Sequence, residues 1–315
     1  TTTWHVLCLM PDPQLYSQAM LTTAIVSAVA ILAMASLRQS AGMTWLNSFS
    51  VVGIGVGLSV GYRVLALQLA WPPVSSLDRF LTLVIPAAAA IELVAGFDSV
   101  AKWFAWFLRV ILAAATPRIL LHDSVYLSDS DFTWSLWEAI AILTCCGVLM
   151  AALWSLLAWL HSRSPGVSIP LALSLTVQCA GITVMLAGYI KGGAAAFPLA
   201  ATLTTTTGVV WLFKKRSGNP TEICEFGIIG IGVVGLSSLL IIGRFFGGLS
   251  TYSALTIQLA PLLCWATEIP YLRHRNRWIV GLIRLLLLVI PLLWILAEAK
   301  SDFDRDMAPL LTRAA

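Results

Sequence analysis

Residues 226–243 read FGIIGIGVVGLSSLLIIG and contain no charged side chain. A helix of about 20 such apolar residues reaches across the roughly 30 Å hydrocarbon core of a bilayer. Segments of similar composition recur along the chain, which predicts an all-α, polytopic membrane bundle with about ten transmembrane helices. The predicted spans are 19–37, 44–70, 80–97, 101–121, 133–160, 168–190, 194–213, 223–246, 251–270 and 277–297.

The composition of the 315-residue chain agrees with an exterior that faces lipid. The chain is 59% hydrophobic and 11% charged, with a mean hydropathy of +0.88, whereas soluble domains carry roughly 25% charged residues. The 13 tryptophans suit the headgroup boundary, where indole rings are enriched. No basic segment is interleaved with aromatic residues, so the lipid bilayer is an expected partner and nucleic acid is not.

The distribution of lysine and arginine predicts the orientation, because cytoplasmic loops carry an excess of both. With ten spans, one side holds Arg38, Lys102, Arg163, Lys214–Arg216 and Arg273–Arg277. The other side holds the acidic loop 122–131 with Arg79, Lys191 and Arg244. The basic side is therefore predicted to be cytoplasmic and both termini non-cytoplasmic, in a bacterial-type inner (plasma) membrane. Residues 1–18 lack the basic region of a signal peptide, so the first helix is predicted to be retained.

Two parts of the chain resemble each other weakly, which predicts an internal repeat. Gly53–Ser59 reads GIGVGLS, and Gly230–Ser237 reads GIGVVGLS. Further along, Pro86 and Glu92 correspond to Pro261 and Glu268. Trp103, Arg109 and Pro117 then correspond, in the same order, to Trp278, Arg284 and Pro291. An offset of six helices keeps the orientation the same, so the repeat is expected to be parallel. The predicted organisation is an N-terminal segment 1–18, repeat one at 19–121, an outer loop and two linker helices at 122–190, repeat two at 191–297 and a tail at 298–315.

Ionisable residues inside the predicted spans are the main candidates for function, because charge at membrane depth is costly. Each repeat contains an Arg–Glu–Arg set: Arg63, Glu92 and Arg109 in the first, and Arg244, Glu268 and Arg284 in the second. One hypothesis is that these side chains line a central path that binds an anion or relays protons. The other is that each glutamate neutralises an arginine on a neighbouring helix and holds the two together. Arg63, Arg244 and Glu268 could also extend to the membrane interface.

A second feature of the first repeat is the glycine ladder Gly53, Gly57 and Gly61. Glycines four residues apart lie on one stripe of a helix and allow another backbone to approach closely. We expect the ladder to pack against a helix of the same chain. Contact with a second protein is the alternative.

No motif in the sequence specifies a catalytic centre, a metal site or a cofactor. The six cysteines lack ligand spacing, and all four histidines lie in predicted loops or tails. His122 and Asp123, with Asp129 and Asp131, could bind a divalent cation, although a solvated acidic loop is the simpler interpretation. We therefore expect a protein that is not an enzyme and that needs no cofactor.

Two functions remain open from the sequence. The first is a secondary transporter or permease for a small solute, based on the repeat, the buried charges and the proline-containing helices. The alternative is a non-catalytic structural or accessory subunit of a larger membrane complex, with other membrane subunits or a second copy of this chain as partners. An intramembrane enzyme acting on lipids is the weakest hypothesis, because no polar cluster has a catalytic pattern.

Overall fold

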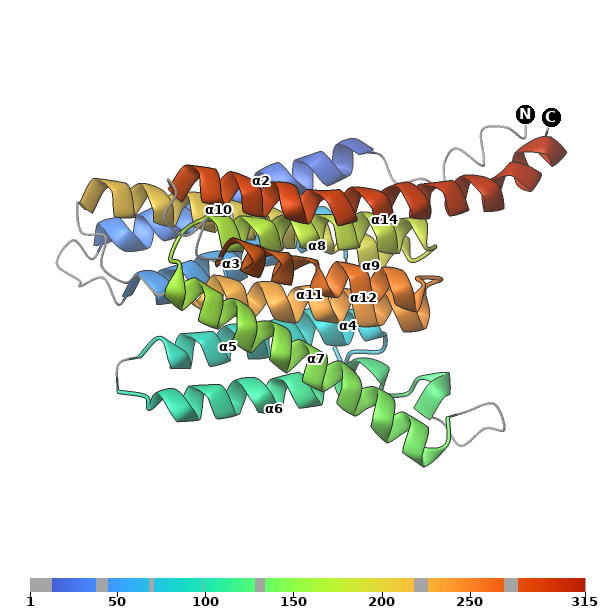
Figure 1. Cartoon of the computed structure of the whole chain (residues 1–315), viewed down its shortest axis with the longest axis horizontal. Helices are drawn as coiled ribbons and strands as arrows, with labels where there is room; N and C mark the ends of the chain where they lie inside the picture. The colour runs from blue at the N-terminus through green and yellow to red at the C-terminus, as the bar shows by residue number, and fades with distance from the viewer. Residues whose placement is uncertain are drawn as a thin grey trace.

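The computed structural model describes residues 13–37, 45–67, 71–97, 99–127, 134–217, 226–268 and 277–314, and all regular structure within these ranges is helical (Figure 1). The first half contains α2 (Pro13–Leu37), α3 (Trp45–Val64), α4 (Ser76–Arg79), the π-helical turn η1 (Phe80–Val84), α5 (Ile85–Ala95), α6 (Lys102–Leu121) and the short 3₁₀ turn η2 (Val125–Leu127). The second half contains α7 (Leu136–Arg163), α8 (Ser168–Leu186), α9 (Ile190–Ala194), α10 (Ala196–Ser217), α11 (Phe226–Phe246), α12 (Thr251–Leu259), the 3₁₀ segment η3 (Ala260–Glu268) and α14 (Arg277–Ala314).

Eight helices of the described residues are long and apolar enough to cross a membrane by length and composition. They are α2, α3, α6, α7, α8, α9 with α10, α11 and α14. Two further predicted spans, 80–97 and 251–270, are helical but irregular. The first contains η1 and α5, which directly follow α4, and the second contains α12 and η3 as far as Glu268, where the described residues end.

A proline accompanies the change of helix type in both irregular segments. Pro86 is the second residue of α5, directly after the π-helical turn, and Pro261 is the second residue of η3. Proline has no N–H, so the carbonyl four residues before it loses its helical hydrogen bond. The regular α-helical pattern is therefore interrupted at these two points, and the flanking residues form π-helical and 3₁₀ hydrogen bonds instead.

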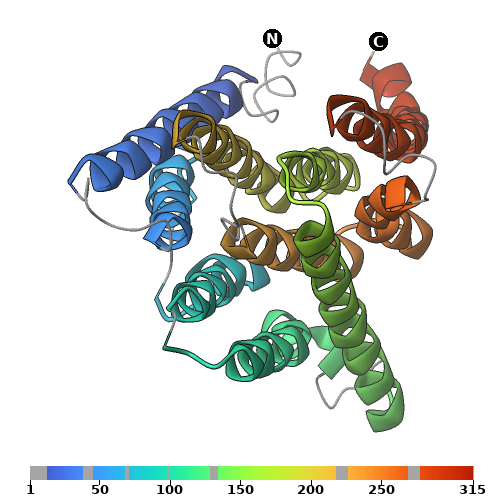
Figure 2. The same cartoon turned by 60° about the vertical axis from the view of Figure 1, so that its left-hand side comes forward.

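The helices lie side by side along the long axis of the molecule, and α11 is at the centre (Figure 1 and Figure 2). In the most apolar 18 residues of Gly227–Phe246, 89% of the residues are buried. Around it lie α3, α5, α6, α7, α8, α10 and α12. A helix that is apolar all round is expected in such a position, because it has no solvent-facing side.

Glycines on α11 allow this close packing. A β-carbon at Gly232 would overlap Leu173 of α8, and one at Gly235 would overlap Leu199 of α10. At Gly230, it would lie 2.5 Å from the carboxylate oxygen Oε1 of Glu92 on α5. The central helix is glycine-rich because its neighbours occupy the space that side chains would fill.

The glycine ladder of α3 packs within the same chain. A β-carbon at Gly57 would lie 2.8 Å from Cγ2 of Thr202 on α10 and 2.9 Å from Cβ of Ser27 on α2. Gly53 meets Ile31 of α2, and Gly61 meets Thr23 of α2 and Pro198 of α10. The stripe is therefore covered by α2 and α10.

The predicted tail 298–315 continues α14 as a helix as far as Ala314. At 1.5 Å per residue, this 38-residue helix is about 57 Å long. Its C-terminal part extends beyond the other helices (Figure 1). The last buried side chain of α14 in the described part is Ile295, and residues 298–306 carry the charged sequence EAKSDFDRD.

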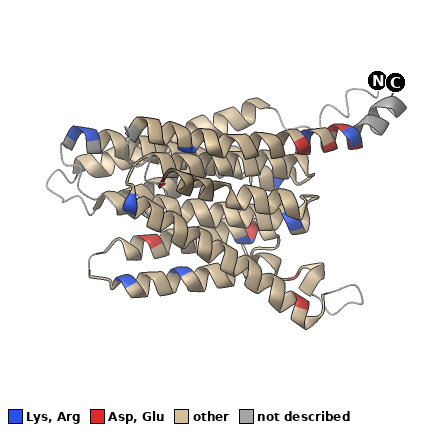
Figure 3. Ribbon diagram, viewed as in Figure 1, with Lys and Arg blue, Asp and Glu red and all other residues tan. Residues whose placement is uncertain are grey.

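Charged residues at the helix ends are distributed unequally (Figure 3). Lys102 at the start of α6, Arg163 at the end of α7 and Lys215 near the end of α10 lie at the same end of the bundle. The opposite end carries charges of both signs: Asp78 and Glu138 near the starts of α4 and α7, and Arg63, Arg79, Arg118, Lys191 and Arg244 in the last turns of α3, α4, α6, α9 and α11. Arg38, Arg273 and Arg275, which belong to the predicted basic side, lie outside the described residues.

Candidate functional site

The first candidate centre is an ion pair between α5 and α6. Nε of Arg109 donates to Oε1 of Glu92, and Nη2 of Arg109 donates to Oε2, both at 2.8 Å. Glu92 is fully buried and Arg109 is 6% exposed. This bidentate geometry aligns the planar guanidinium with the carboxylate and satisfies both oxygens.

Aromatic rings and a glycine enclose this pair. The guanidinium carbon of Arg109 lies 4.9 Å from the centre of the Trp106 ring and 5.6 Å from that of Trp154 on α7. Gly230 of α11 leaves room for the carboxylate of Glu92. Indole faces attract a desolvated cation, so these contacts stabilise Arg109 together with its counter-ion.

The second candidate centre surrounds Arg284 of α14, which is 2% exposed. Its Nη2 donates to Oε1 of Glu268 at 2.9 Å and to Oγ of Ser164 at 3.0 Å. Its Nε donates to Oγ1 of Thr267 at 2.7 Å, and its Nη1 to Oγ of Ser168 at 3.1 Å. Every nitrogen of this guanidinium is therefore hydrogen-bonded, mostly to hydroxyl groups.

The two centres share a layout and differ in exposure. In both, the glutamate lies in the last part of an irregular segment, and the arginine lies seven residues after the start of the next helix. The Glu92 side chain is completely buried, whereas that of Glu268 is 15% exposed. Glu92 holds Arg109 through both oxygens, but only one oxygen of Glu268 is bonded to Arg284.

Arg63 and Arg244 do not belong to these centres, and both are exposed rather than buried. Each lies in the last turn of its helix, α3 or α11. Nε of Arg244 donates to Oγ1 of Thr251 at 2.8 Å. The expected Arg–Glu–Arg sets are therefore two Glu–Arg pairs, because a long side chain near a helix end reaches the surface.

The loop after α6 forms a separate polar cluster. Oδ2 of Asp123 lies 2.9 Å from Nη2 of Arg79 and 2.7 Å from Nδ1 of His122. The Arg79 guanidinium also donates to the carbonyl of His122. Asp129 and Asp131 lie outside the described residues, and within those residues no group of three His, Cys, Asp or Glu side chains could hold a metal ion.

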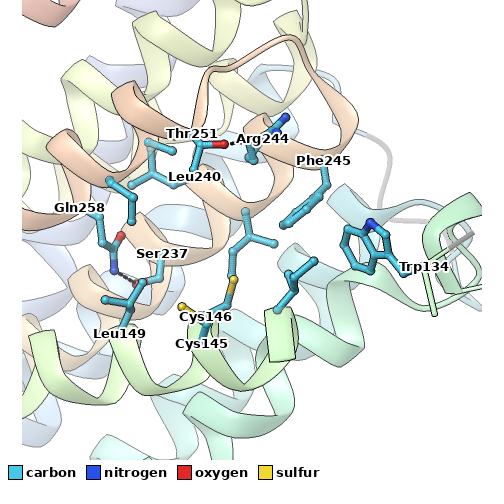
Figure 4. A pocket seen from close by; sticks show the side chains of 14 residues that line it. Trp134, Cys145, Cys146, Leu149, Ser237, Leu240, Arg244, Phe245, Thr251 and Gln258 are labelled. Carbon is cyan, nitrogen blue, oxygen red and sulfur yellow. Dashed lines mark hydrogen bonds between the residues drawn. The ribbon is translucent and has the colours of Figure 1, made fainter. Parts of the chain in front are cut away.

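A pocket of about 420 Å³ lies between α7, α11 and α12 (Figure 4). Its walls are mainly apolar, and Arg244 and Thr251 lie at one end. Ser237 and Gln258 lie deeper, and Nε2 of Gln258 donates to Oγ of Ser237 at 2.8 Å. The sequence analysis did not predict this pocket. The sequence feature that could have indicated it is a pair of polar residues, Ser237 and Gln258, inside two apolar spans.

The pocket and the first ion pair lie along the same face of α11. Successive helical residues are rotated by 100°, so Gly230, Val234, Ser237, Ile241 and Arg244 lie within roughly 80° of one another about the axis. The last three line the pocket, and Gly230 contacts Glu92. Val234, between them, is fully buried. The pocket therefore ends about 10 Å, or two helical turns, from the level of Gly230.

These features describe a helical bundle that is rich in membrane-length helices, with two Glu–Arg pairs and a mainly apolar pocket. No protein-family model, no curated protein and no solved structure matches the chain. A function is therefore inferred from the residues themselves.

Proposed function

We propose that this chain is a secondary transporter or permease for a small solute, in which Glu92, Arg109, Glu268 and Arg284 are the working charges. The observation that carries the proposal is the pairing of each irregular helical segment with an arginine on the following helix. Interrupted helices within a membrane occur where they are buried in protein or line a cavity. A pair of them in corresponding positions is the usual sign of a transporter binding region.

The proposed cycle exchanges the partner of each arginine. In the closed arrangement, each guanidinium is bonded to a glutamate. A proton on the glutamate removes its charge, and the buried arginine then requires another anion. A small anionic solute would take that place, so that proton and anion move together.

The same proposal includes the parallel repeat of 19–121 and 191–297 and the orientation of the chain. The equivalent positions of Glu92 and Glu268, and of Arg109 and Arg284, support the repeat. The basic helix ends at Lys102, Arg163 and Lys215 support a cytoplasmic location for that end of the bundle. Both termini would then be non-cytoplasmic.

The test is ion flux into proteoliposomes that contain an entrapped pH indicator. Phosphate and sulfate, which do not cross a bilayer unaided, are added in turn under an imposed pH gradient. We expect proton movement with at least one anion for the wild type and none for Glu92→Gln or Glu268→Gln. Arg63→Gln is the matched control, because Arg63 is exposed and far from both pairs in sequence. Normal flux in both glutamate variants would refute the role of the carboxylates.

A second candidate, an accessory subunit of a membrane complex, is supported by α14. The last turns of α14 extend past the bundle. A short helical segment that packs against nothing is only marginally stable in water, so a partner would stabilise it. The test is gentle extraction followed by native mass spectrometry of the full chain and of a chain truncated after Ala297. A stoichiometric partner that is lost on truncation would favour this function. Migration of the full chain alone would argue against it.

A further inference from the structure

We propose that the pocket between α7, α11 and α12 binds an anionic amphiphile from the bilayer, with its acidic headgroup on Arg244 and its apolar part along α7. This inference concerns binding only. It holds whether or not the chain transports a solute.

The mouth of the pocket has the properties of a headgroup site. Arg244 is exposed in the last turn of α11, and among the described residues its guanidinium is hydrogen-bonded through Nε alone. Beside it, the rings of Trp134, Phe245 and Tyr126 form a cluster with centre-to-centre distances of 4.8 to 5.6 Å. Aromatic rings and arginine together are typical of the headgroup level of a membrane.

The interior of the pocket suits an apolar chain. Cys146, Leu149 and Leu240 contribute to its wall (Figure 4). Cys145 and Leu255, on its two sides, are exposed, so the opening lies between α7 and α12. Its volume of about 420 Å³ falls within the range of small-molecule sites, roughly 300–1,000 Å³. A molecule within the bilayer can therefore enter from the side.

A polar group at the inner end provides a second, independent indication of a ligand. Gln258 is 7% exposed, and its Oε1 has no hydrogen-bond partner among the described residues. A buried amide oxygen without a partner is unfavourable. Ser237 and Arg244 are seven residues apart on α11, which is about 10 Å along the axis. The occupied pocket thus places an anionic group at Arg244 and, about 10 Å deeper, a hydrogen-bond donor to Gln258, which is a buried water molecule when the ligand is a phospholipid.

The test uses native mass spectrometry of the full chain after exchange into phosphatidylglycerol or phosphatidylcholine with the same acyl chains. We expect the wild type to retain one phosphatidylglycerol roughly tenfold more than phosphatidylcholine, the size of effect of one hydrogen bond to a charged group. Arg244→Gln should lose this preference. Arg63→Gln, which changes another exposed arginine in the last turn of a helix, should keep it.

A second readout does not depend on the headgroup contact. Ala254→Trp places a large ring in the pocket and should abolish retention of the lipid. Phosphatidylglycerol with brominated chains should quench part of the tryptophan fluorescence of the wild type, and this quenched part should be missing in Trp134→Phe. Equal retention of both lipids by the wild type, an equal loss in Arg244→Gln and Arg63→Gln, or retention that is unchanged in Ala254→Trp would overturn the proposal.

Discussion

The most distinctive residues of this protein are Glu92 and Arg109, whose carboxylate and guanidinium groups are both buried away from water. Glu92 and Arg109 neutralise each other through two hydrogen bonds of 2.8 Å. Such a pair contributes little net stability compared with apolar residues of the same size, but loss of one partner leaves a buried charge. The pair therefore favours one helix arrangement, and a change in protonation would destabilise that arrangement.

The first prediction concerns the two members of this pair. Arg109→Met leaves the carboxylate of Glu92 buried without a counter-ion, and we expect it to destabilise the protein by about 3–5 kcal/mol. The double variant Glu92→Gln with Arg109→Met should recover most of this loss. Thermal unfolding in detergent gives the comparison. Equal destabilisation in the single and double variants would show that the charges do not interact as described.

A second prediction concerns the glycine beside this pair. Gly230→Ala places a methyl group 2.5 Å from Oε1 of Glu92 and 2.8 Å from the Trp154 ring. Both neighbours contact Arg109 and have little freedom to move, so we expect a loss of about 1–3 kcal/mol. Gly208→Ala on α10 is the control, because nothing lies within 4 Å of the added carbon. That variant should be neutral or slightly stabilised when its unfolding midpoint is measured.

The sequence identifies the candidate charges but not their partners. Apolar spans do not reveal which helices are neighbours, so sequence spacing groups Arg63 and Arg244 with the pairs although both are exposed. The sequence likewise does not indicate which hydroxyl groups bind Arg284 at the second centre. Ser164 and Ser168, at the end of α7 and the start of α8, bond Arg284 from more than a hundred residues away in the chain.

At the scale of the elements, prolines and glycines determine the arrangement. The predicted boundaries agree closely with the structure for 101–121 against Lys102–Leu121, whereas the helix predicted at 277–297 continues to Ala314. Pro86 and Pro261 indicate breaks, but the sequence does not indicate that one break is a π-helical turn and the other a 3₁₀ segment. That choice depends on which hydrogen bonds the surrounding helices permit.

A third prediction follows for the second irregular segment. In Pro261→Ala, the restored N–H can bond the carbonyl of Ile257 and favours a continuous α-helix. Residue 268 would then rotate away from Arg284, because a 3₁₀ helix advances by about 120° per residue and an α-helix by about 100°. We expect Glu268→Gln to destabilise the wild type by roughly 1.5–3 kcal/mol, with no further loss in the Pro261→Ala background. Equal effects in both backgrounds, measured by thermal unfolding, would contradict this explanation.

At the scale of the whole molecule, the helices form layers around α11 and connect the two ends of the bundle. α2 begins, and α14 ends, at the same end (Figure 1). The polar composition of 298–315 gives no indication that α14 projects so far, because side chains without an apolar face do not specify a packed helix. The number of membrane crossings stays a prediction, because two of the ten proposed spans are irregular.

A fourth prediction tests this topology. Reporter tags placed before residue 1 and after residue 315 should both be found on the non-cytoplasmic side, and a tag inserted between residues 217 and 226 on the cytoplasmic side. Protease protection in sealed vesicles measures all three. Termini on opposite sides would mean an odd number of crossings, which would exclude a parallel repeat within ten spans.

The most direct test of the central claim is the accessibility of the α11 face between the pocket and Glu92. In a chain whose native cysteines are replaced, Val234→Cys and Leu236→Cys each introduce one thiol at a fully buried position. Position 234 lies on the face of Gly230 and Ser237, whereas position 236 lies on the opposite face, toward α8 and α10. A transporter opens to each side of the membrane in turn, and we take each open state to be populated at roughly 0.1–10%. We therefore expect a membrane-impermeant maleimide to label Val234→Cys slowly from both sides of sealed vesicles. Leu236→Cys should not be labelled from either side. Equal protection of both thiols from either side would contradict the transport function.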